Sequence, residues 1–235
     1  MKIEKAIILG AGLGTRLLPL TENTPKPLLP IAGKPCINYI IEHLKRFGIN
    51  NIAINTHHAS EKIQNTLKDG SPLAVKIFYS HEENLLGSAG AIKRIENFFN
   101  KETFILYNGD VLCNCDIQKA IDFHKKSGNI VTLILIDDNY CRDIEINEKN
   151  EIINIKKSDN DNVFTYSGIQ IIEPEIFRHI PKDSASSIIS IYTELIKKGI
   201  KINGFLSDDC YWRDIGTIES YNKAQEELNS GFPIK

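Results

Sequence analysis

The sequence predicts an α/β fold: a doubly wound, mostly parallel sheet, followed by a smaller α+β lobe. The first 137 residues contain short apolar runs of strand length, separated by amphipathic segments with a helical period. Such alternation favours parallel strand pairing, and right-handed crossovers then place helices on both faces of the sheet. After residue 138 the alternation gives way to hairpin-like patterns, which predict the second lobe.

The elements of the first lobe follow from apolar runs and their helical spacing. The strands expected from β-branched and aromatic runs cover residues 5–9, 51–55, 75–79, 103–107 and 130–136. The clearest helix covers residues 36–47, because its isoleucines and Leu44 share one face and Gly48 supplies a stop. Further helices are expected from residue 60, at 88–98 and at 116–126.

The second lobe begins with alternating residues on both sides of the turn sequence Glu148-Lys149-Asn150, which predicts a hairpin. The elements expected after it are a strand at 162–172, helices at 173–179 and 184–198, a strand at 200–206 and a helix from Thr217. No linker or internal repeat separates the lobes. We therefore predict one domain over residues 1–235, with lobes at 1–137 and 138–235.

Composition excludes several classes of protein. The formal net charge of −2 gives no electrostatic basis for binding nucleic acid or an anionic membrane. No apolar run approaches the roughly 20 residues of a membrane span, and the N-terminus lacks the pattern of a signal peptide. We expect a cytoplasmic protein without membrane partners. The five cysteines lack zinc-site spacing, even at Cys113 and Cys115, and are expected to be reduced thiols without a metal role.

The stretch LGAGLGTRLLPLTENTPKPLLPIAGKP at residues 9–35 contains the most distinctive local pattern. It fails the dinucleotide fingerprint, because Thr15 stands where the last glycine is required and several prolines prevent a prompt helix. It also fails the P-loop pattern, since Pro35 follows Gly33-Lys34 and no glycine stands five residues before Gly33.

A different phosphate-binding device remains open for this loop. Glycines allow backbone N–H groups to approach an anion closely. Arg16 offers a planar fork of donors for phosphate oxygens, and Lys26 offers a point charge. A structural loop with two solvated cations is the alternative, and the residues alone leave both open.

Further motifs follow in order along almost the whole chain. They are LLGSAGAI at 85–92, YNGDVL at 107–112, IKKS at 155–158, YSGI at 166–169 and WRDIGT at 212–217. Together with the loop at 9–35, they resemble the sugar-1-phosphate nucleotidyltransferases. The resemblance implies the Rossmann-like nucleotide-diphospho-sugar transferase fold. It also implies transfer of a nucleotidyl group from an NTP to a sugar 1-phosphate, with release of pyrophosphate.

The resemblance assigns roles to residues that match the family motifs. The catalytic residues it implies are Arg16, Lys26 and Asp110. The nucleotide-binding residues are Gly10, Ala11, Gly12, Gly14, Thr15, Gly87 and Ser88. The sugar-phosphate-binding residues are Asn108, Lys157 and Gly168. Lys157 departs from the family pattern Glu-Lys-Pro, because Lys156 and Ser158 flank it.

A magnesium site is implied at Asp110 and Asp214. Asp110 follows the strand expected at 103–107, and ligands of open α/β sheets bind at the carboxyl ends of strands. Two carboxylates about 4 Å apart would repel by roughly 4 kcal/mol at an effective dielectric of 20, and a divalent cation removes that repulsion. His57 and His58 form a loop pair without an evident metal-ligand partner and receive no role.

The substrates are expected to be an NTP and a sugar 1-phosphate. The short chain is similar to mannose- or heptose-1-phosphate guanylyltransferases, which favours GTP, and to N-acetylmuramate-1-phosphate uridylyltransferases. UTP with N-acetylmuramate- or glucose-1-phosphate is therefore an alternative, as are a choline-phosphate cytidylyltransferase-like enzyme and a non-catalytic nucleotide-sugar-binding regulator. A metal-dependent glycosyltransferase is disfavoured, because D-x-D occurs only at Asp159–Asp161 in a polar run. A homodimer is compatible with the sequence.

Overall fold

The computed structural model describes residues 2–158, 160–182, 184–208 and 210–231. The chain forms two compact units that interleave along the sequence. Unit 1 comprises Met1–Ile3, Leu86–Leu106 and Cys115–Cys210, and unit 2 comprises Glu4–Leu85, Tyr107–Asn114 and Tyr211–Lys235. Asp159, one half of the D-x-D pattern, lies outside the described residues.

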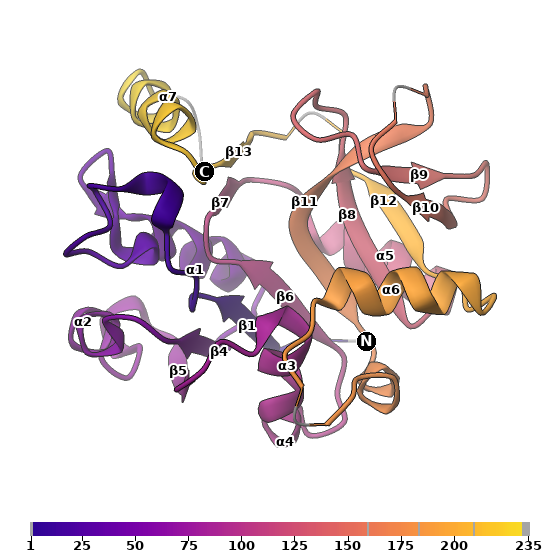
Figure 1. The fold of residues 1–235 in the computed structure, drawn as a ribbon, viewed down its shortest axis with the longest axis horizontal. Coiled ribbons are helices and arrows are strands. Elements are labelled where there is room, and N and C mark those ends of the chain that lie inside the picture. Colours follow the sequence, from indigo (N-terminus) through magenta and orange to yellow (C-terminus); the bar gives the residue numbers. More distant parts are fainter. Residues whose placement is uncertain (1, 159, 183, 209, 232–235) are drawn as a thin grey trace. The chain divides into compact units, whose positions relative to one another are not determined.

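Unit 2 is built on parallel strands β1 (Lys5–Leu9), β4 (Asn51–Thr56) and β5 (Lys76–His81), which lie side by side in Figure 1. The interior positions of β1 and β4 are fully buried isoleucines and alanines, as the apolar runs predicted. Strand β6 (Phe104–Asn108) passes from unit 1 into unit 2. The three predicted strands of this unit are confirmed to within two residues.

Helix α1 (Cys36–Arg46) confirms the predicted helix over 36–47, and its isoleucines and Leu44 are buried. Helix α2 (Ser60–Leu67) begins where the sequence predicted. Between β1 and α1, the long loop contains two short 3-10 helices, Thr15–Leu17 and Lys26–Leu28. A two-stranded ribbon follows, with β2 (Pro30–Ile31) antiparallel to β3 (Lys34–Pro35).

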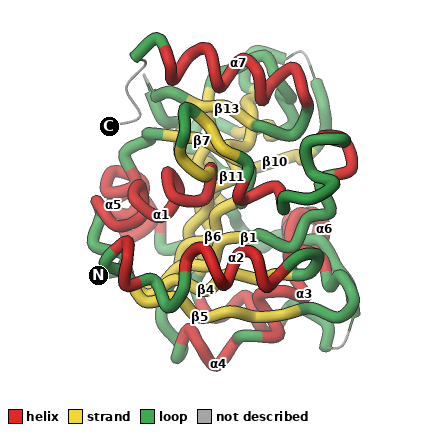
Figure 2. Tube along the Cα trace, turned by 90° about the vertical axis from the view of Figure 1, so that its left-hand side faces the viewer, coloured by secondary structure: helices red, strands yellow, loops and turns green. Residues whose placement is uncertain are grey.

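A second small ladder in unit 2 was not predicted from the sequence. Strand β7 (Val111–Cys113) pairs antiparallel with β13 (Trp212–Asp214), as Figure 2 shows. Helix α7 (Ile218–Asn229) follows β13, and Thr217 caps it through a reciprocal capping box with Ser220. The ladder thus joins a segment from the middle of the chain to one near its end.

Unit 1 contains a mixed sheet. Strand β11 (Val163–Ile172) runs antiparallel to β8 (Val131–Ile136), and β12 (Asn203–Leu206) runs parallel to β8. The predicted hairpin is confirmed as β9 (Ile144–Ile146) and β10 (Ile152–Ile155), with β9 also pairing with β11. The architecture is mixed α/β with a largely parallel central sheet, as predicted.

Of the four helices predicted in unit 1, the one at 116–126 is confirmed as α5 (Ile117–Ser127) to within one residue, and the other three are interrupted or shorter than predicted. The helix expected at 88–98 is interrupted at Ile95, giving α3 (Gly87–Arg94) and α4 (Glu96–Phe99). Helix α5, capped by Asp116, and helix α6 (Ile188–Lys197) lie on opposite faces of the unit 1 strands (Figures 1 and 2). The helix expected at 173–179 is a 3-10 turn over Pro174–Arg178. Among the described residues, no helix has the length and apolar character needed to cross a bilayer.

Candidate active site

The glycine loop begins where β1 ends, in tight contact with two neighbouring backbone segments. Gly109 donates its backbone N–H to the Leu9 carbonyl (3.0 Å), and a Cβ at Gly109 would lie 2.4 Å from that oxygen. A Cβ at Gly10 would lie 3.0 Å from the Asn55 carbonyl oxygen. Any side chain at position 109 would clash with the Leu9 carbonyl oxygen. Glycine at this position therefore allows the turn that contains Asp110 to lie close to the start of the loop.

The next residues of the loop form an exposed turn. Gly14 adopts a φ of +67°, which glycine tolerates at no steric cost, and its carbonyl accepts the Thr21 hydroxyl at 2.8 Å. Thr15 and Arg16 then form the first 3-10 turn, with both side chains exposed. Of the two remaining predicted nucleotide positions in the loop, Ala11 is buried and Gly12 is exposed. A Cβ added at Gly12 would meet no described residue beyond its chain neighbours within 4 Å.

An amide and a carboxyl group hold the start of this loop, and sequence reasoning missed both. The Gly10 N–H donates to Asn55 Oδ1 at 2.8 Å, and Asn55 Nδ2 donates to Glu82 Oε1 at 2.8 Å. Glu82 is almost fully buried, and its carbonyl oxygen lies 2.8 Å from His57 Nδ1. The signal available in the sequence was an Asn at the carboxyl end of the strand that follows the loop.

Lys26 and Asp110 form an ion pair across 84 positions of the chain. Lys26 Nζ lies 2.6 Å from Asp110 Oδ2, and the two side chains are 10% and 29% exposed. Pro25 precedes the 3-10 turn that begins at Lys26 and restrains the backbone there. A nearly buried ammonium group is thus held on a carboxylate at the carboxyl end of β6, where α/β sheets bind ligands.

The β7–β13 ladder carries the second aspartate. Asp214 pairs with Val111 in the register, and the Ile215 N–H donates to the Asp110 carbonyl at 2.9 Å. Asp214 Oδ1 accepts the Gly216 N–H at 2.7 Å, and a Cβ on Gly216 would lie 2.5 Å from that oxygen. The ladder therefore places Asp214 next to the Asp110 backbone, although more than a hundred residues separate them.

Arg16 approaches the same turn. A Cβ on Gly216 would lie 3.0 Å from a terminal nitrogen of Arg16, so Arg16 and Asp214 border one space too small for a methyl group. The thiol of Cys36 is fully buried at the start of α1. Burial raises the pKa of the Cys36 thiol, Asp110 and Asp214 raise it further, and Lys26 lowers it. The thiol thus experiences the field of all three charged groups.

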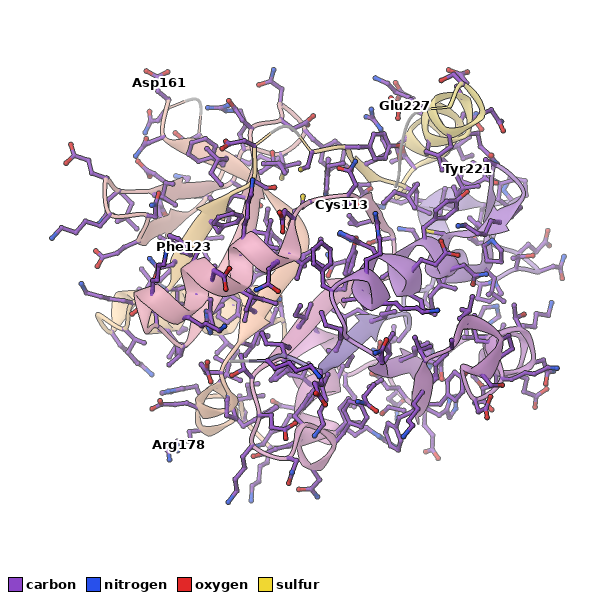
Figure 3. All side chains as sticks on the ribbon, turned by 180° about the vertical axis from the view of Figure 1, so that it is seen from behind. Cys113, Phe123, Asp161, Arg178, Tyr221 and Glu227 are labelled. Atoms are coloured by element: carbon purple, nitrogen blue, oxygen red, sulfur yellow. The ribbon has the colours of Figure 1, made fainter. Side chains whose placement is uncertain are left out.

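Helix α7 fixes both the ladder and the end of the glycine loop. Glu227 of this helix accepts two bonds from Arg213, at 2.6 and 3.2 Å, and the Tyr211 hydroxyl at 2.9 Å. Tyr221 donates its hydroxyl to the Pro30 carbonyl at 2.6 Å. Figure 3 shows Tyr221 and Glu227 projecting from this one helix. As a result, helix α7 is bonded both to the β13 segment and to the loop that carries Lys26.

Asn108 is half-exposed at the end of β6, two residues before Asp110. Within unit 2, the structure therefore gathers the loop glycines, Arg16, Lys26, Asp110 and Asp214 at the carboxyl ends of β1 and β6. These are charged groups of both signs next to a loop in which Gly10, Gly12 and Gly14 carry no side chain. Such an arrangement suits a phosphate ligand that is accompanied by a cation.

The remaining predicted residues lie in unit 1. Gly87 begins α3 with a φ of +68°, and a Cβ there would lie 2.5 Å from the Ser186 carbonyl oxygen. Ser88 Oγ accepts the Ile188 N–H at 2.9 Å, which satisfies a backbone donor at the start of α6. These residues therefore have structural contacts of their own, in addition to the predicted role in binding nucleotide.

Lys157 and Gly168 lie on different strands of unit 1. Lys157 is exposed just after β10. Gly168 is buried within β11, with a φ of +86°, where the pairing with β8 shifts between Tyr166 and Gln170. The glycine thus permits a bulge in a long strand.

Comparison with known proteins identifies the family. The family described as Nucleotidyl transferase matches residues 5–231. D-glycero-alpha-D-manno-heptose 1-phosphate guanylyltransferase of Aneurinibacillus thermoaerophilus is 32% identical, over 95% of this chain and 98% of the relative. UTP–glucose-1-phosphate uridylyltransferase of Synechocystis sp. is 30% identical over 94% of this chain, which spans 62% of that relative.

A solved structure shows the same fold. The crystal structure of HddC from Yersinia pseudotuberculosis matches with a TM-score of 0.81 and 27% sequence identity, over 96% of this chain and 100% of that chain. Together with the match over residues 5–231, this similarity establishes that the chain belongs to the nucleotidyl transferase family.

Proposed function

We propose that this protein transfers a nucleotidyl group from an NTP to a sugar 1-phosphate, giving a nucleotide sugar and pyrophosphate. The observation that carries the proposal is the 2.6 Å ion pair between Lys26 and Asp110 beside the glycine loop. Asp214 adds a second carboxyl group through the β7–β13 ladder. Membership of the family supports this class of reaction.

In this proposal, the positive groups of unit 2 bind the triphosphate. An oxygen of the sugar phosphate attacks the α-phosphorus, and pyrophosphate leaves from the opposite side. Such a transfer depends on positioning and on stabilising the negative charge that spreads over the phosphoryl oxygens. The exposed Arg16 would bind the leaving phosphates, and the nearly buried Lys26 would stabilise charge at the reacting phosphoryl group.

The carboxyl groups of Asp110 and Asp214 fit a magnesium ion. Mg²⁺ prefers oxygen ligands and is commonly held by one or two carboxylates together with substrate phosphates. The Asp110 side chain is partly exposed. The Ile215 N–H donates to the Asp110 carbonyl oxygen, which brings Asp214 close to Asp110 in the fold. The two carboxyl groups can therefore bind one ion. When bound, the ion would neutralise phosphate charge and orient the triphosphate.

Sugar-phosphate binding is proposed for Asn108, Lys157 and Gly168. Asn108 offers an amide at the end of β6, and Lys157 offers an exposed ammonium group that can move to a phosphate. Gly168 removes a side chain from a bulged strand, which permits close approach of a sugar ring.

We propose GTP with mannose 1-phosphate or heptose 1-phosphate as the substrates. Two heptose-1-phosphate guanylyltransferases match over almost the full length of both chains, and one N-acetylmuramate-1-phosphate uridylyltransferase does the same. UTP with glucose 1-phosphate or N-acetylmuramate 1-phosphate is the second candidate, because both uridylyltransferases are similar at nearly the same identity.

The experiment that tests the function is a screen of NTPs against sugar 1-phosphates, read by pyrophosphate release with Mg²⁺. We expect release with one guanylyl or uridylyl pair, loss of release with excess chelator, and recovery when Mg²⁺ is restored. Absence of release with every pair would contradict the enzymatic function. Release that is unaffected by chelation would contradict the magnesium site.

A further inference from the structure

The sulfur atoms of Cys113, Cys115 and Cys210 lie within 4.8 Å of one another at the end of the β7–β13 ladder. In this antiparallel ladder, Trp212 pairs with Cys113. If the same pairing is continued by two residues on each strand, Cys210 lies opposite Cys115. The Sγ atoms of Cys115 and Cys210 lie 2.7 Å apart. Opposite residues of an antiparallel pair project from the same face, which explains why these two side chains converge.

The separation favours a covalent bond between these sulfurs. Non-bonded sulfur atoms pack at greater distances, and a disulfide needs about 2.05 Å, so a shift of about 0.7 Å joins them. Side chains alone can supply a shift of this size. The two sulfur atoms are therefore close enough for a cross-link between Cys115 and Cys210.

The two thiols differ in their access to solvent. Cys115 is fully buried, directly before Asp116, which caps α5. Cys210 is partly exposed, in the connection that precedes β13. An oxidant from solvent thus reaches Cys210 first, and Cys115 is placed to resolve the product.

We propose that Cys115 and Cys210 form a reversible disulfide when the protein meets a peroxide. In the first step the Cys210 thiolate attacks one peroxide oxygen and becomes a sulfenic acid, while the other oxygen leaves as water. In the second step the Cys115 sulfur attacks the sulfenic sulfur, the S–S bond forms, and a second water leaves. The two thiols are oxidised and the peroxide is reduced to two waters.

The cross-link would fasten the ladder that carries Asp214. Cys115 and Cys210 are 95 positions apart in the sequence, so the cross-link would close a long loop. They are the first and last residues of the Cys115–Cys210 segment of unit 1, and the cross-link would tie the two ends of this segment together. Restricting a loop of this length stabilises the folded state, and for a chain of this size we expect a rise in Tm of roughly 5–10 °C. The inference does not depend on the proposed enzymatic activity.

The experiment treats the full chain with a small excess of hydrogen peroxide, blocks remaining thiols with an alkylating reagent, and measures intact mass and peptides. We expect a mass lower by about 2 Da before alkylation, since two hydrogen atoms leave. We also expect a cross-linked peptide pair containing Cys115 and Cys210, reversed by dithiothreitol. A thermal melt before and after reduction measures the rise in Tm.

Single substitutions identify the pair. Cys115→Ser and Cys210→Ser should each abolish the cross-link, whereas Cys113→Ser, two residues away in the same segment, should retain it. A disulfide that contains Cys113, or oxidation that stops at a sulfenic or sulfinic acid on Cys210 in the wild-type chain, would overturn the proposal. An unchanged Tm in the cross-linked protein would overturn the stabilising effect.

Discussion

In unit 2, the predicted site residues contact one another. In unit 1, the predicted residues Gly87 and Ser88 instead contact backbone atoms that belong to no predicted site. In unit 2, Lys26 pairs with Asp110 at 2.6 Å, and Ile215 joins Asp214 to the Asp110 backbone. In unit 1, Gly87 packs on the Ser186 backbone. The difference indicates that unit 2 holds its charged groups in place before any ligand binds. Substitutions of these charged groups in unit 2 should mainly lower the rate of the reaction, and substitutions of the predicted residues in unit 1 should mainly weaken binding.

The largest effect is expected from Lys26→Ala. The change removes the cation proposed to stabilise the reacting phosphoryl group, so kcat/KM should fall by a hundredfold or more, about 3 kcal/mol. Initial rates of pyrophosphate release at varied NTP and sugar 1-phosphate concentrations measure kcat/KM. Lys34→Ala is the matched control, because Lys34 lies on the same long loop but pairs with Glu42 at 2.7 Å on the surface. Near-normal turnover by the Lys26 variant would show that its role is misassigned.

Gly109→Ala tests how closely the Asp110 turn must approach β1. The new Cβ would lie 2.4 Å from the Leu9 carbonyl oxygen, and a backbone atom cannot swing away as a side chain can. We expect a loss of roughly 1–3 kcal/mol in the free energy of unfolding, or about 2–10 °C in Tm. Gly12→Ala is the control, since no described residue beyond its chain neighbours lies within 4 Å of its Cβ position. Equal melting temperatures for both variants would contradict the tight contact at Gly109.

Asn55→Ala should produce a smaller effect on nucleotide binding. The variant leaves the Gly10 N–H without its acceptor and the buried Glu82 without its amide donor. A lost hydrogen bond of this kind costs roughly 1–3 kcal/mol, and we expect about a tenfold rise in KM for the NTP with a smaller change in kcat. Asn51→Ala, at the other end of β4, provides the control. A change in kcat without a change in KM would contradict a positioning role.

The sequence predicted the strands well because long apolar runs with β-branched residues leave little ambiguity. It missed the β7–β13 ladder, because three-residue strands have no measurable period and their pairing spans about a hundred positions. The predicted helix over 88–98 is interrupted at Ile95, a position without glycine or proline to mark it. Residue patterns suggested Arg16 and Lys26 as phosphate ligands but left a structural loop equally open. Only the family motifs paired them with Asp110 and Asp214.

The pair Asn55 and Glu82 shows a different limit. A single amide and a single carboxyl group form no motif, and their importance comes from the hydrogen bonds that tie them to Gly10. Such bonds depend on which strands are neighbours and on the register between β1 and β4. Side chains that act by holding other groups are therefore the part of a site that a single sequence reveals least.

The smallest effect is expected from Lys157→Ala, and it tests the comparison from the side of unit 1. Lys157 is exposed just after β10, and an exposed cation contributes up to about 1 kcal/mol to an ionic contact, which corresponds to roughly a fivefold rise in KM for the sugar 1-phosphate. Stability should not change. Lys156→Ala, also exposed and next in sequence, should leave that KM unchanged. Initial rates at varied sugar-phosphate concentration separate the two variants. A fall in kcat as large as that of the Lys26 variant would place Lys157 among the groups that stabilise the reacting phosphoryl group, and the contrast between rate in unit 2 and binding in unit 1 would then fail.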